Sequence, residues 1–172
     1  MTRITKATLV VLILGFFTSF NAHAWNKCYK AGFADLSHLT ITDAVVATED
    51  LSILKDLVVG ADLAGLLADN EQFFTVFAPV NSAFENLLAG LAPTDETVLE
   101  TLTYHVKPGY FDPRRTWYIR EVTTANPDGQ TLFVKRTRNN VQINQSTLVD
   151  CQGIRLSNGI VFLIDSVLLP QQ

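Results

Sequence analysis

The chain has 172 residues, of which 48% are hydrophobic, so it is long enough for one domain with a substantial core and short for two. Seventeen acidic residues outnumber thirteen basic ones, and the formal net charge is −4 at pH 7. This acidic balance argues against nucleic acid as a partner, because a phosphate backbone attracts proteins rich in Lys and Arg.

The N-terminus has the pattern of a signal peptide. Two basic residues precede a largely apolar run over residues 7–20, and Ala22-His23-Ala24 supplies the small residues of a cleavage site. We therefore predict a signal peptide over residues 1–24, cleaved between Ala24 and Trp25, and a secreted or periplasmic mature protein. Because the apolar run is shorter than the roughly 20 residues that span a bilayer, we expect no stable membrane span after cleavage. An uncleaved N-terminal anchor is the alternative.

The sequence contains two cysteines, Cys28 and Cys151. In an exported chain, a pair of cysteines favours one disulfide. Two free thiols, or a metal site completed by His38 and His105, are the alternatives. The metal site is the weaker one, because neither cysteine has a second ligand at the close spacing that zinc sites use. We expect no metal ion and no cofactor.

Helical periodicity dominates the first part of the mature chain. Residues 25–39 lack a clear period and are predicted to form an extended segment tied down by Cys28. The predicted helices that follow are 41–48, started by Thr40 with Asp43 in its first turn; 51–58, closed by Gly60; and a third, opened by Asp62.

The stretch over residues 73–88 changes period in its middle. Phe73 to Phe77 is β-branched or aromatic, which predicts a strand buried on both faces. Pro79 should end this strand, because proline has no N–H for a β-ladder. Asn81 is then predicted to cap a helix whose apolar face carries Phe84, Leu87 and Leu88.

The second half changes from helical to strand-like patterns. A helix is predicted from Thr94, with Val98, Leu99 and Leu102 on its buried face. Strands are then predicted over residues 121–124, 131–137, 141–148 and 160–168, separated by turn sequences rich in Asn, Gly and Pro. Helices grouped early and strands grouped late indicate an α+β domain.

Three ordered boxes stand out in this pattern. Residues 75–84 read TVFAPVNSAF, residues 104–106 read YHV, and residues 158–170 read NGIVFLIDSVLLP. In letters, order and spacing they resemble the fasciclin domain family, over residues 40–170. The resemblance implies a fasciclin-like fold, in which short helices pack on a β-sheet wedge. The motif residues to which it gives a structural or recognition role are Asn81, Tyr104, His105, Asn158, Gly159 and Asp165.

The chain most resembles the secreted mycobacterial fasciclin antigens. These carry one Cys near the mature N-terminus and a second seven residues before the Asn of the closing box, a separation that Cys151 and Asn158 share. Because those members join the two cysteines, the resemblance implies a Cys28–Cys151 disulfide. This disulfide would tie an N-terminal extension, residues 25–39, to the domain.

The chain also departs from the family pattern. Val80 stands where Thr is usual, so Asn81 must cap its helix without help, and Phe162 stands where many members have His. Animal matrix members are thought to use an Asp-Ile pair for integrin contact. Gly153-Ile154 occupies that place here, so integrin binding through this pair is not expected.

Two motif residues have more than one interpretation. His105 is either a half-buried imidazole that fixes backbone groups or, together with Tyr104, a recognition pair. Asp165 lies in an apolar stretch, so its carboxylate must be hydrogen-bonded or paired. A catalytic acid is the weaker interpretation of Asp165, because no motif places a second carboxylate beside it.

Arg114, Arg115, Trp117 and Tyr118 combine cations and flat aromatic rings on a predicted loop. This mixture is compatible with a candidate binding surface. Ordinary stacking within an exposed loop is the alternative.

Known catalytic motifs are missing from the sequence, so we expect no catalytic residue and no enzyme. The resemblance implies an exported adhesion or extracellular binding module, with a protein or polysaccharide surface as its partner. The alternative is a periplasmic carrier or sensor of a small apolar ligand, which needs a pocket of about 300 Å³ or more. Asn144-Gln145-Ser146 is a glycosylation sequon that matters only in a eukaryotic secretory pathway.

Overall fold

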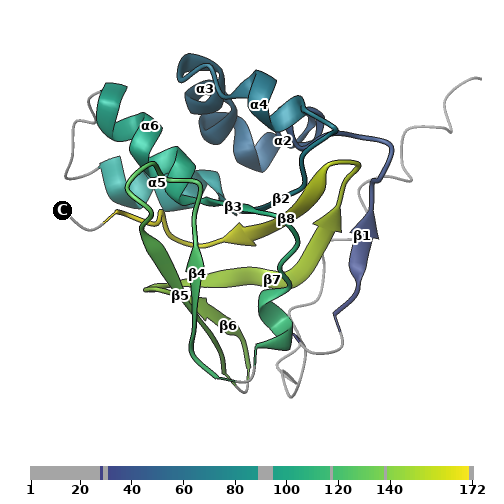
Figure 1. The fold of residues 1–172 in the computed structure, drawn as a ribbon, viewed down its shortest axis with the longest axis vertical. Coiled ribbons are helices and arrows are strands. Elements are labelled where there is room, and N and C mark those ends of the chain that lie inside the picture. The colour runs from purple at the N-terminus through teal and green to yellow at the C-terminus, as the bar shows by residue number, and fades with distance from the viewer. Residues whose placement is uncertain (1–27, 29–30, 89–94, 117, 138, 171–172) are drawn as a thin grey trace, which may run out of the picture.

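The computed structural model describes residues 28, 31–88, 95–116, 118–137 and 139–170, which form a layer of helices beside a curled β-sheet (Figure 1). The helices are α2 (Ile41–Ala47), α3 (Ser52–Gly60), α4 (Ala64–Ala68), α5 (Asn81–Leu88) and α6 (Asp95–Tyr104), with 3-10 turns η1 (Glu49–Leu51) and η2 (Pro113–Arg115). The strands are β1 (Phe33–Asp35), β2 (Phe74–Pro79), β3 (Val106–Pro108), β4 (Arg120–Thr123), β5 (Thr131–Arg136), β6 (Val141–Ile143), β7 (Ser146–Arg155) and β8 (Gly159–Ile164). The predicted α+β fold, with short helices on a β-sheet, is confirmed.

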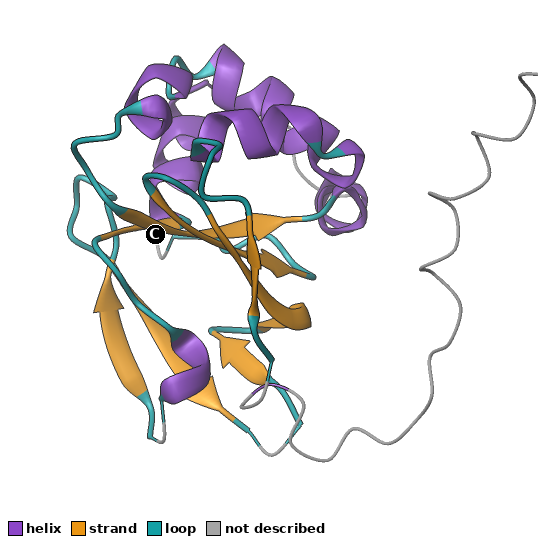
Figure 2. Cartoon of the chain, turned by 90° about the vertical axis from the view of Figure 1, so that its right-hand side faces the viewer, coloured by secondary structure: helices purple, strands orange, loops and turns teal. Residues whose placement is uncertain are grey.

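The strands follow one another in space in the order β3-β2-β8-β7-β6-β5-β4, and β1 pairs with β7 in parallel. β2 and β8 are also parallel, with Phe74 opposite Gly159 and Pro79 opposite Ile164. The other neighbours on this path are antiparallel. Figure 2 shows the helices α2 to α6 gathered on one side, over the part of the sheet that contains β2 and β8, while the rest of the sheet, with the short turn η2, folds away from them.

Strands β2 and β8 separate two hydrophobic clusters. Every residue of β2 is buried. Side chains alternate along a strand, so Val76 joins Leu54 in the cluster beneath the helices, whereas Phe77 meets Phe162 in the cluster inside the curled sheet. The predicted strand buried on both faces is therefore confirmed and ends at Pro79, although Phe73 lies outside it and is 38% exposed.

The start of α2 is fixed by its own side chains. The Thr40 hydroxyl accepts a hydrogen bond from the Asp43 N–H at 3.2 Å. The Asp43 carboxylate in turn accepts from the Thr40 N–H at 3.0 Å. This reciprocal capping box satisfies two N–H groups that the helix leaves unpaired, as the sequence predicted.

The end of α3 differs from the prediction. Gly60 lies inside the helix, and the left-handed residue is Asp62, with φ of 57°. The Asp62 N–H bonds to the Val59 carbonyl and the Leu63 N–H to the Val58 carbonyl, at 3.2 and 3.0 Å. This pair of bonds is a Schellman motif, so Asp62 ends α3 and does not open the next helix.

The predicted strand over residues 141–148 is two strands, β6 and β7, joined by a turn in which Asn144 has φ of 51°. β7 then continues to Arg155, with an irregular register between Leu148 and Gly153, where Cys151 has φ of 59°. Such a bulge interrupts the alternation of side chains, so the sequence pattern hid most of β7. The sequence did not predict β1 and β3, because each has only three residues, which is too short to show the alternation of side chains typical of a strand.

Two smaller predictions were also wrong. Leu99, expected on the buried face of α6, is 41% exposed, while Leu102 is buried as expected. The predicted last strand, 160–168, ends at Ile164, after which the Asp165 N–H turns to the Thr147 carbonyl at 3.1 Å.

Candidate functional site

Cys28 and Cys151 form a disulfide, with their Cα atoms 4.9 Å apart. The bond ties the N-terminal extension to the bulged part of β7, the strand with which β1 also pairs. The predicted disulfide is confirmed, and free thiols or a metal site at these two residues are excluded. The predicted cleavage site between Ala24 and Trp25 lies outside the described residues.

Asn81 is the first residue of α5, yet its side chain caps a different helix. Its Oδ1 accepts from the Ile53 N–H, in the first turn of α3, at 3.1 Å. Its Nδ2 donates to the Glu49 carbonyl at 3.1 Å and to the Ser52 Oγ at 3.0 Å. The prediction that Asn81 caps its own helix is therefore wrong, because its amide joins the first box to the η1–α3 junction.

Tyr104 ends α6 and is 1% exposed. Its hydroxyl donates to the Thr131 carbonyl at 2.9 Å and accepts from the Asn144 Nδ2 at 3.0 Å. The Asn144 Oδ1 accepts from the Phe133 N–H at 2.8 Å. Both polar atoms of the sequon residue are thus engaged within the fold, and so is the tyrosine hydroxyl.

His105 is 3% exposed and lies between α6 and β3. Its Nε2 accepts from the Leu168 N–H at 2.9 Å, and its Nδ1 lies 2.7 Å from the Thr101 carbonyl oxygen. Because a backbone N–H can only donate, the imidazole is neutral and carries its proton on Nδ1. Burial lowers the pKa of His105 to about 4, against an opposing effect of the Thr101 carbonyl. Both ring nitrogens are occupied, which favours the structural interpretation over the recognition pair.

Asn158 and Gly159 hold the closing box against the helices. Asn158 is 1% exposed; its Oδ1 accepts from the Ile41 N–H at 2.9 Å, at the start of α2. Its Nδ2 donates to the carbonyls of Leu67 and Asp69 at 2.7 and 2.9 Å. A Cβ on Gly159 would lie 2.4 Å from a carbonyl oxygen of β2, so only glycine allows the two strands to approach this closely.

Asp165 is exposed and follows β8, so the expected position inside a buried strand is wrong. Its Oδ1 accepts from the Ser146 Oγ and the Thr147 N–H, at 3.0 and 2.8 Å, and its Oδ2 accepts from the Thr147 Oγ1 at 2.6 Å. Desolvation raises the pKa of Asp165, but hydrogen bonds from Thr147, Ser146 and Ser166 outweigh it, so the pKa lies below its ordinary value. These hydrogen bonds of the Asp165 carboxylate hold the end of β8 against the start of β7.

The predicted basic and aromatic surface is divided by the structure. Arg114 is 4% exposed, and its Nε and Nη2 donate to the two oxygens of Asp112 at 2.8 and 2.9 Å. Its Nη1 donates to the carbonyls of Ala31, Gly32 and Cys151 at 2.6, 2.8 and 3.3 Å. The assignment of Arg114 to a binding surface is therefore wrong, because its guanidinium is used to join η2, the N-terminal extension and β7.

The exposed remainder of this segment is Arg115, Tyr118 and Ile119, which we call the loop surface. The side chain of Arg115 is 78% exposed and approaches Asp112 only at 3.5 Å. Tyr118 is 84% exposed and Ile119 is 62% exposed. The sequence did not single out Ile119, and Trp117 lies outside the described residues.

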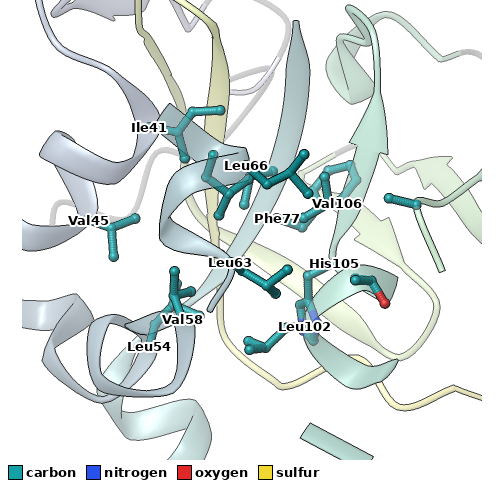
Figure 3. A pocket seen from close by; sticks show the side chains of 14 residues that line it. Ile41, Val45, Leu54, Val58, Leu63, Leu66, Phe77, Leu102, His105 and Val106 are labelled. Carbon is teal, nitrogen blue, oxygen red and sulfur yellow. The ribbon is translucent and has the colours of Figure 1, made fainter. Parts of the chain in front are cut away.

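An apolar cavity lies between the helices and the sheet (Figure 3). Its volume is about 30 Å³, and its lining includes Ile41, Leu54, Leu102 and His105. That is the space of about one water molecule, far below the roughly 300 Å³ at which ligand pockets begin. This cavity does not support the alternative of a carrier or sensor for a small apolar ligand.

A second hollow is an open groove of about 400 Å³. Lys107 and Pro108 of β3 lie along one side, and residues 120–124, on and just after β4, lie along the other. Phe111 completes the lining. No sequence pattern indicated this groove, because the residues that line it come from separate segments without a common period.

Among residues 28, 31–88, 95–116, 118–137 and 139–170, no group of three or more His, Cys, Asp or Glu side chains is placed to hold a metal ion. Within the same ranges, no helix has the length and apolar character needed to cross a membrane.

Residues 49–170 match the family model described as the Fasciclin domain. The chain belongs to the fasciclin family. The resemblance carried by the three boxes is therefore confirmed. The helix α2 and its cap precede the matched region, but they pack into the same core through Ile41.

This fasciclin protein is 34% identical to Protein sll1483 of Synechocystis over 140 residues, which is 78% of this chain and 75% of that protein. It is 38% identical over 101 residues to the cell surface glycolipoprotein MPB83 of Mycobacterium bovis, covering 56% of this chain and 44% of the antigen. It is 32% identical over 105 residues to the immunogenic protein MPB70 of the same organism, covering 59% and 52%. The chain thus spans about half the length of these antigens. Neither the family description nor these names indicate an enzymatic family.

A solved structure shares the fold. It is the FAS1 domain pair from the insect cell adhesion molecule fasciclin I, with a TM-score of 0.61 and 16% identity. The match covers 78% of this chain and 52% of that chain. At this identity, the likeness establishes the fold alone.

Sequence reasoning missed two residues that hold the loop region in place. Asp112 is 7% exposed and binds Arg114; the Asp-Pro-Arg-Arg sequence, typical of a capped turn, could have indicated it. The hydroxyl of Thr75 donates to the Gly109 carbonyl and accepts from the Phe111 N–H, both at 2.9 Å. A hydroxyl in an otherwise apolar buried strand was the available signal.

Proposed function

We propose that this fasciclin protein is exported and acts as an adhesion or extracellular binding module, in the periplasm, at the cell surface or outside the cell. The observation that carries the proposal is the contrast in exposure between the box residues and the loop surface. Tyr104, His105 and Asn158 are each 3% exposed or less, so they are not accessible to a partner. Tyr118 and Ile119, in contrast, hold large apolar side chains in solvent.

The composition of the loop surface suits recognition of a protein or polysaccharide. Tyr118 offers a flat ring and a hydroxyl, Arg115 offers an exposed guanidinium whose ion pair with Asp112 is long at 3.5 Å, and Ile119 adds apolar area. Aromatic and arginine side chains of this kind are enriched at binding hot spots. The names of the relatives, a cell surface glycolipoprotein and an immunogenic protein, support a role at or outside the cell surface. The proposed export rests on the predicted signal peptide.

Binding of the purified chain to immobilised cell-envelope and surface-polysaccharide fractions of the producing organism tests this proposal. A Tyr118→Ser, Ile119→Ser double variant should bind at least about tenfold more weakly, because a hot-spot pair is lost. The matched control is Val46→Ser, Val59→Ser, which changes side chains that are 56% and 60% exposed on α2 and α3. Both variants should melt within a few degrees of the native chain. Equal binding by the native chain and the loop-surface variant would overturn the proposal.

A further inference from the structure

The two edges of the curled sheet, β3 and β4, come back toward each other. The Ala125 N–H, just after β4, donates to the Val106 carbonyl of β3 at 2.6 Å. No strand pairing links β3 and β4 among the described residues, and the groove of about 400 Å³ lies between them. The groove is therefore bounded by the edges of two strands, and β4 directly follows Ile119 of the loop surface.

The hydrogen-bond pattern of β4 shows which backbone groups face this groove. β4 is antiparallel to β5, with Val122 opposite Leu132, and the Thr124 N–H donates to the Gln130 carbonyl. In an antiparallel pair, every second residue bonds to its partner strand and the residues between point outward. Val122 and Thr124 therefore bond toward β5. Glu121 and Thr123 direct their N–H and C=O groups the other way, as the outward bond of Ala125 also indicates.

The edge of β3 is blocked, whereas the edge of β4 is open. Pro108 has no N–H, and the Lys107 ammonium donates to the Pro108 carbonyl. Proline and lysine are common means of preventing strand addition. β4 reads Arg-Glu-Val-Thr, has no proline, and exposes Arg120, Glu121 and Thr123. Among the described residues, the outward backbone groups of Glu121 and Thr123 have no hydrogen-bond partner.

We propose that the groove binds an extended peptide segment of a partner protein, which adds to β4 as a further strand. This inference rests on the proposed function and names the mode of binding. Glu121 and Thr123 each supply one donor and one acceptor, so the added strand gains up to four main-chain hydrogen bonds. The volume is within the roughly 300–1,000 Å³ range of ligand sites, and strand addition of this kind is a general mode of peptide recognition.

The groove walls define the chemistry of the peptide. Lys107 and Arg120 contribute two positive charges against the single negative charge of Glu121, and Phe111 gives an apolar contact. A segment in which apolar and acidic residues alternate matches these walls, because successive side chains of a strand point to opposite faces. A second copy of this chain is a poorer occupant, because its β4 carries one arginine and one glutamate and brings no net negative charge to the groove.

Hydrogen exchange on the full chain tests the inference. The probe is a blocked eight-residue peptide in which valine and aspartate alternate. At saturating peptide, exchange of the Glu121 and Thr123 amides should slow at least about tenfold, while the Val122 amide, already bonded to β5, should not change. Protection that is absent, or that does not alternate along β4, would overturn the inference. A lysine-for-aspartate peptide should bind at least about tenfold more weakly, and equal binding would overturn the proposed charge preference.

Two substitutions at one position separate backbone recognition from side-chain recognition. Thr123→Pro removes the outward N–H but no bond to β5, and should weaken peptide binding at least about tenfold. Thr123→Ala keeps the N–H and should bind as the native chain does. An equal loss of peptide binding in both variants would overturn strand addition. Slower exchange of the Glu121 and Thr123 amides on raising the protein concentration, without peptide, would also overturn the inference, because a second copy of the chain would then be the occupant. If the loop-surface variant loses envelope binding while the peptide protects nothing, this inference fails and the proposed function stands.

Discussion

The corner around Asn158 and the segment from Asp112 to β4 use their polar groups in opposite ways. At the first, the amide of a 1% exposed side chain accepts from an N–H at the start of α2 and donates to two carbonyls at the C-terminal end of α4, those of Leu67 and Asp69. At the second, two adjacent arginines diverge: Arg114 is buried on Asp112, whereas the side chain of Arg115 is 78% exposed.

This difference separates the residues that identify the family from those available for binding. The box residues Asn81, Tyr104, His105 and Asn158 each complete hydrogen bonds between elements that are distant in sequence. Their side chains build the scaffold, and a fold by itself does not specify a function. The exposed part of the loop region is where a partner can be recognised, since binding residues are commonly carried by loops on a rigid scaffold.

The largest effect is expected at Arg114, with the adjacent Arg115 as its control. Arg114→Met should lower the free energy of unfolding by about 3–5 kcal/mol, because Asp112 and three carbonyl groups lose their buried partner. Arg115→Met should change it by less than about 0.5 kcal/mol, because its ion pair is exposed and screened. Urea unfolding measures both. Similar losses in the two variants would show that the structural contrast between the arginines is wrong.

A smaller loss is expected at the closing box. Asn158→Ala removes the three hydrogen bonds of a buried amide and should lower the free energy of unfolding by about 3 kcal/mol, at roughly 1 kcal/mol for each bond. The matched control is Ser157→Ala, whose exposed hydroxyl donates to the Asn70 Oδ1 at 2.8 Å and should cost less than about 0.5 kcal/mol. Thermal and urea unfolding give both values. A loss at Asn158 no greater than at Ser157 would contradict a structural role for this box residue.

The smallest of these effects concerns pH. The folded pKa of His105 is about 4, below its ordinary value of 6.5, so between these values the unfolded chain binds a proton that the folded chain does not. Stability should therefore decrease as the pH falls, by about 2.5 kcal/mol between pH 7 and pH 4.5. The carboxylate of Asp165, whose pKa is lowered, loses its stabilising contribution only in more acidic solution.

The control for this pH dependence is His105→Gln, which cannot titrate. This variant should be less stable than the native chain at pH 7, and its stability should depend less on pH over the same interval. Urea unfolding at several pH values measures the slope. An unchanged slope in the variant would show that His105 is not the group responsible.

The sequence was most reliable where a pattern is local. The capping box at Thr40, the strand that ends at Pro79 and the strands near 121–124 and 131–137 depend on neighbouring residues, and they appear in the structure within one or two residues. β7 was largely missed because the left-handed Cys151 and its bulge interrupt the alternation. Asn81 was assigned to the wrong helix because its partner, Ile53, lies 28 residues away.

The sequence by itself determined the family, the α+β class and the pairing of the two cysteines that the family pattern implied. These follow from periodicity and from ordered boxes, which a linear chain displays directly. Only the tertiary structure decided which of two adjacent arginines is buried and which box residues are inaccessible. It also placed an open edge of β4 beside a groove. These properties depend on contacts such as those of Arg114 with Gly32 and Cys151, between segments 82 and 37 residues apart, and local sequence does not encode such distances.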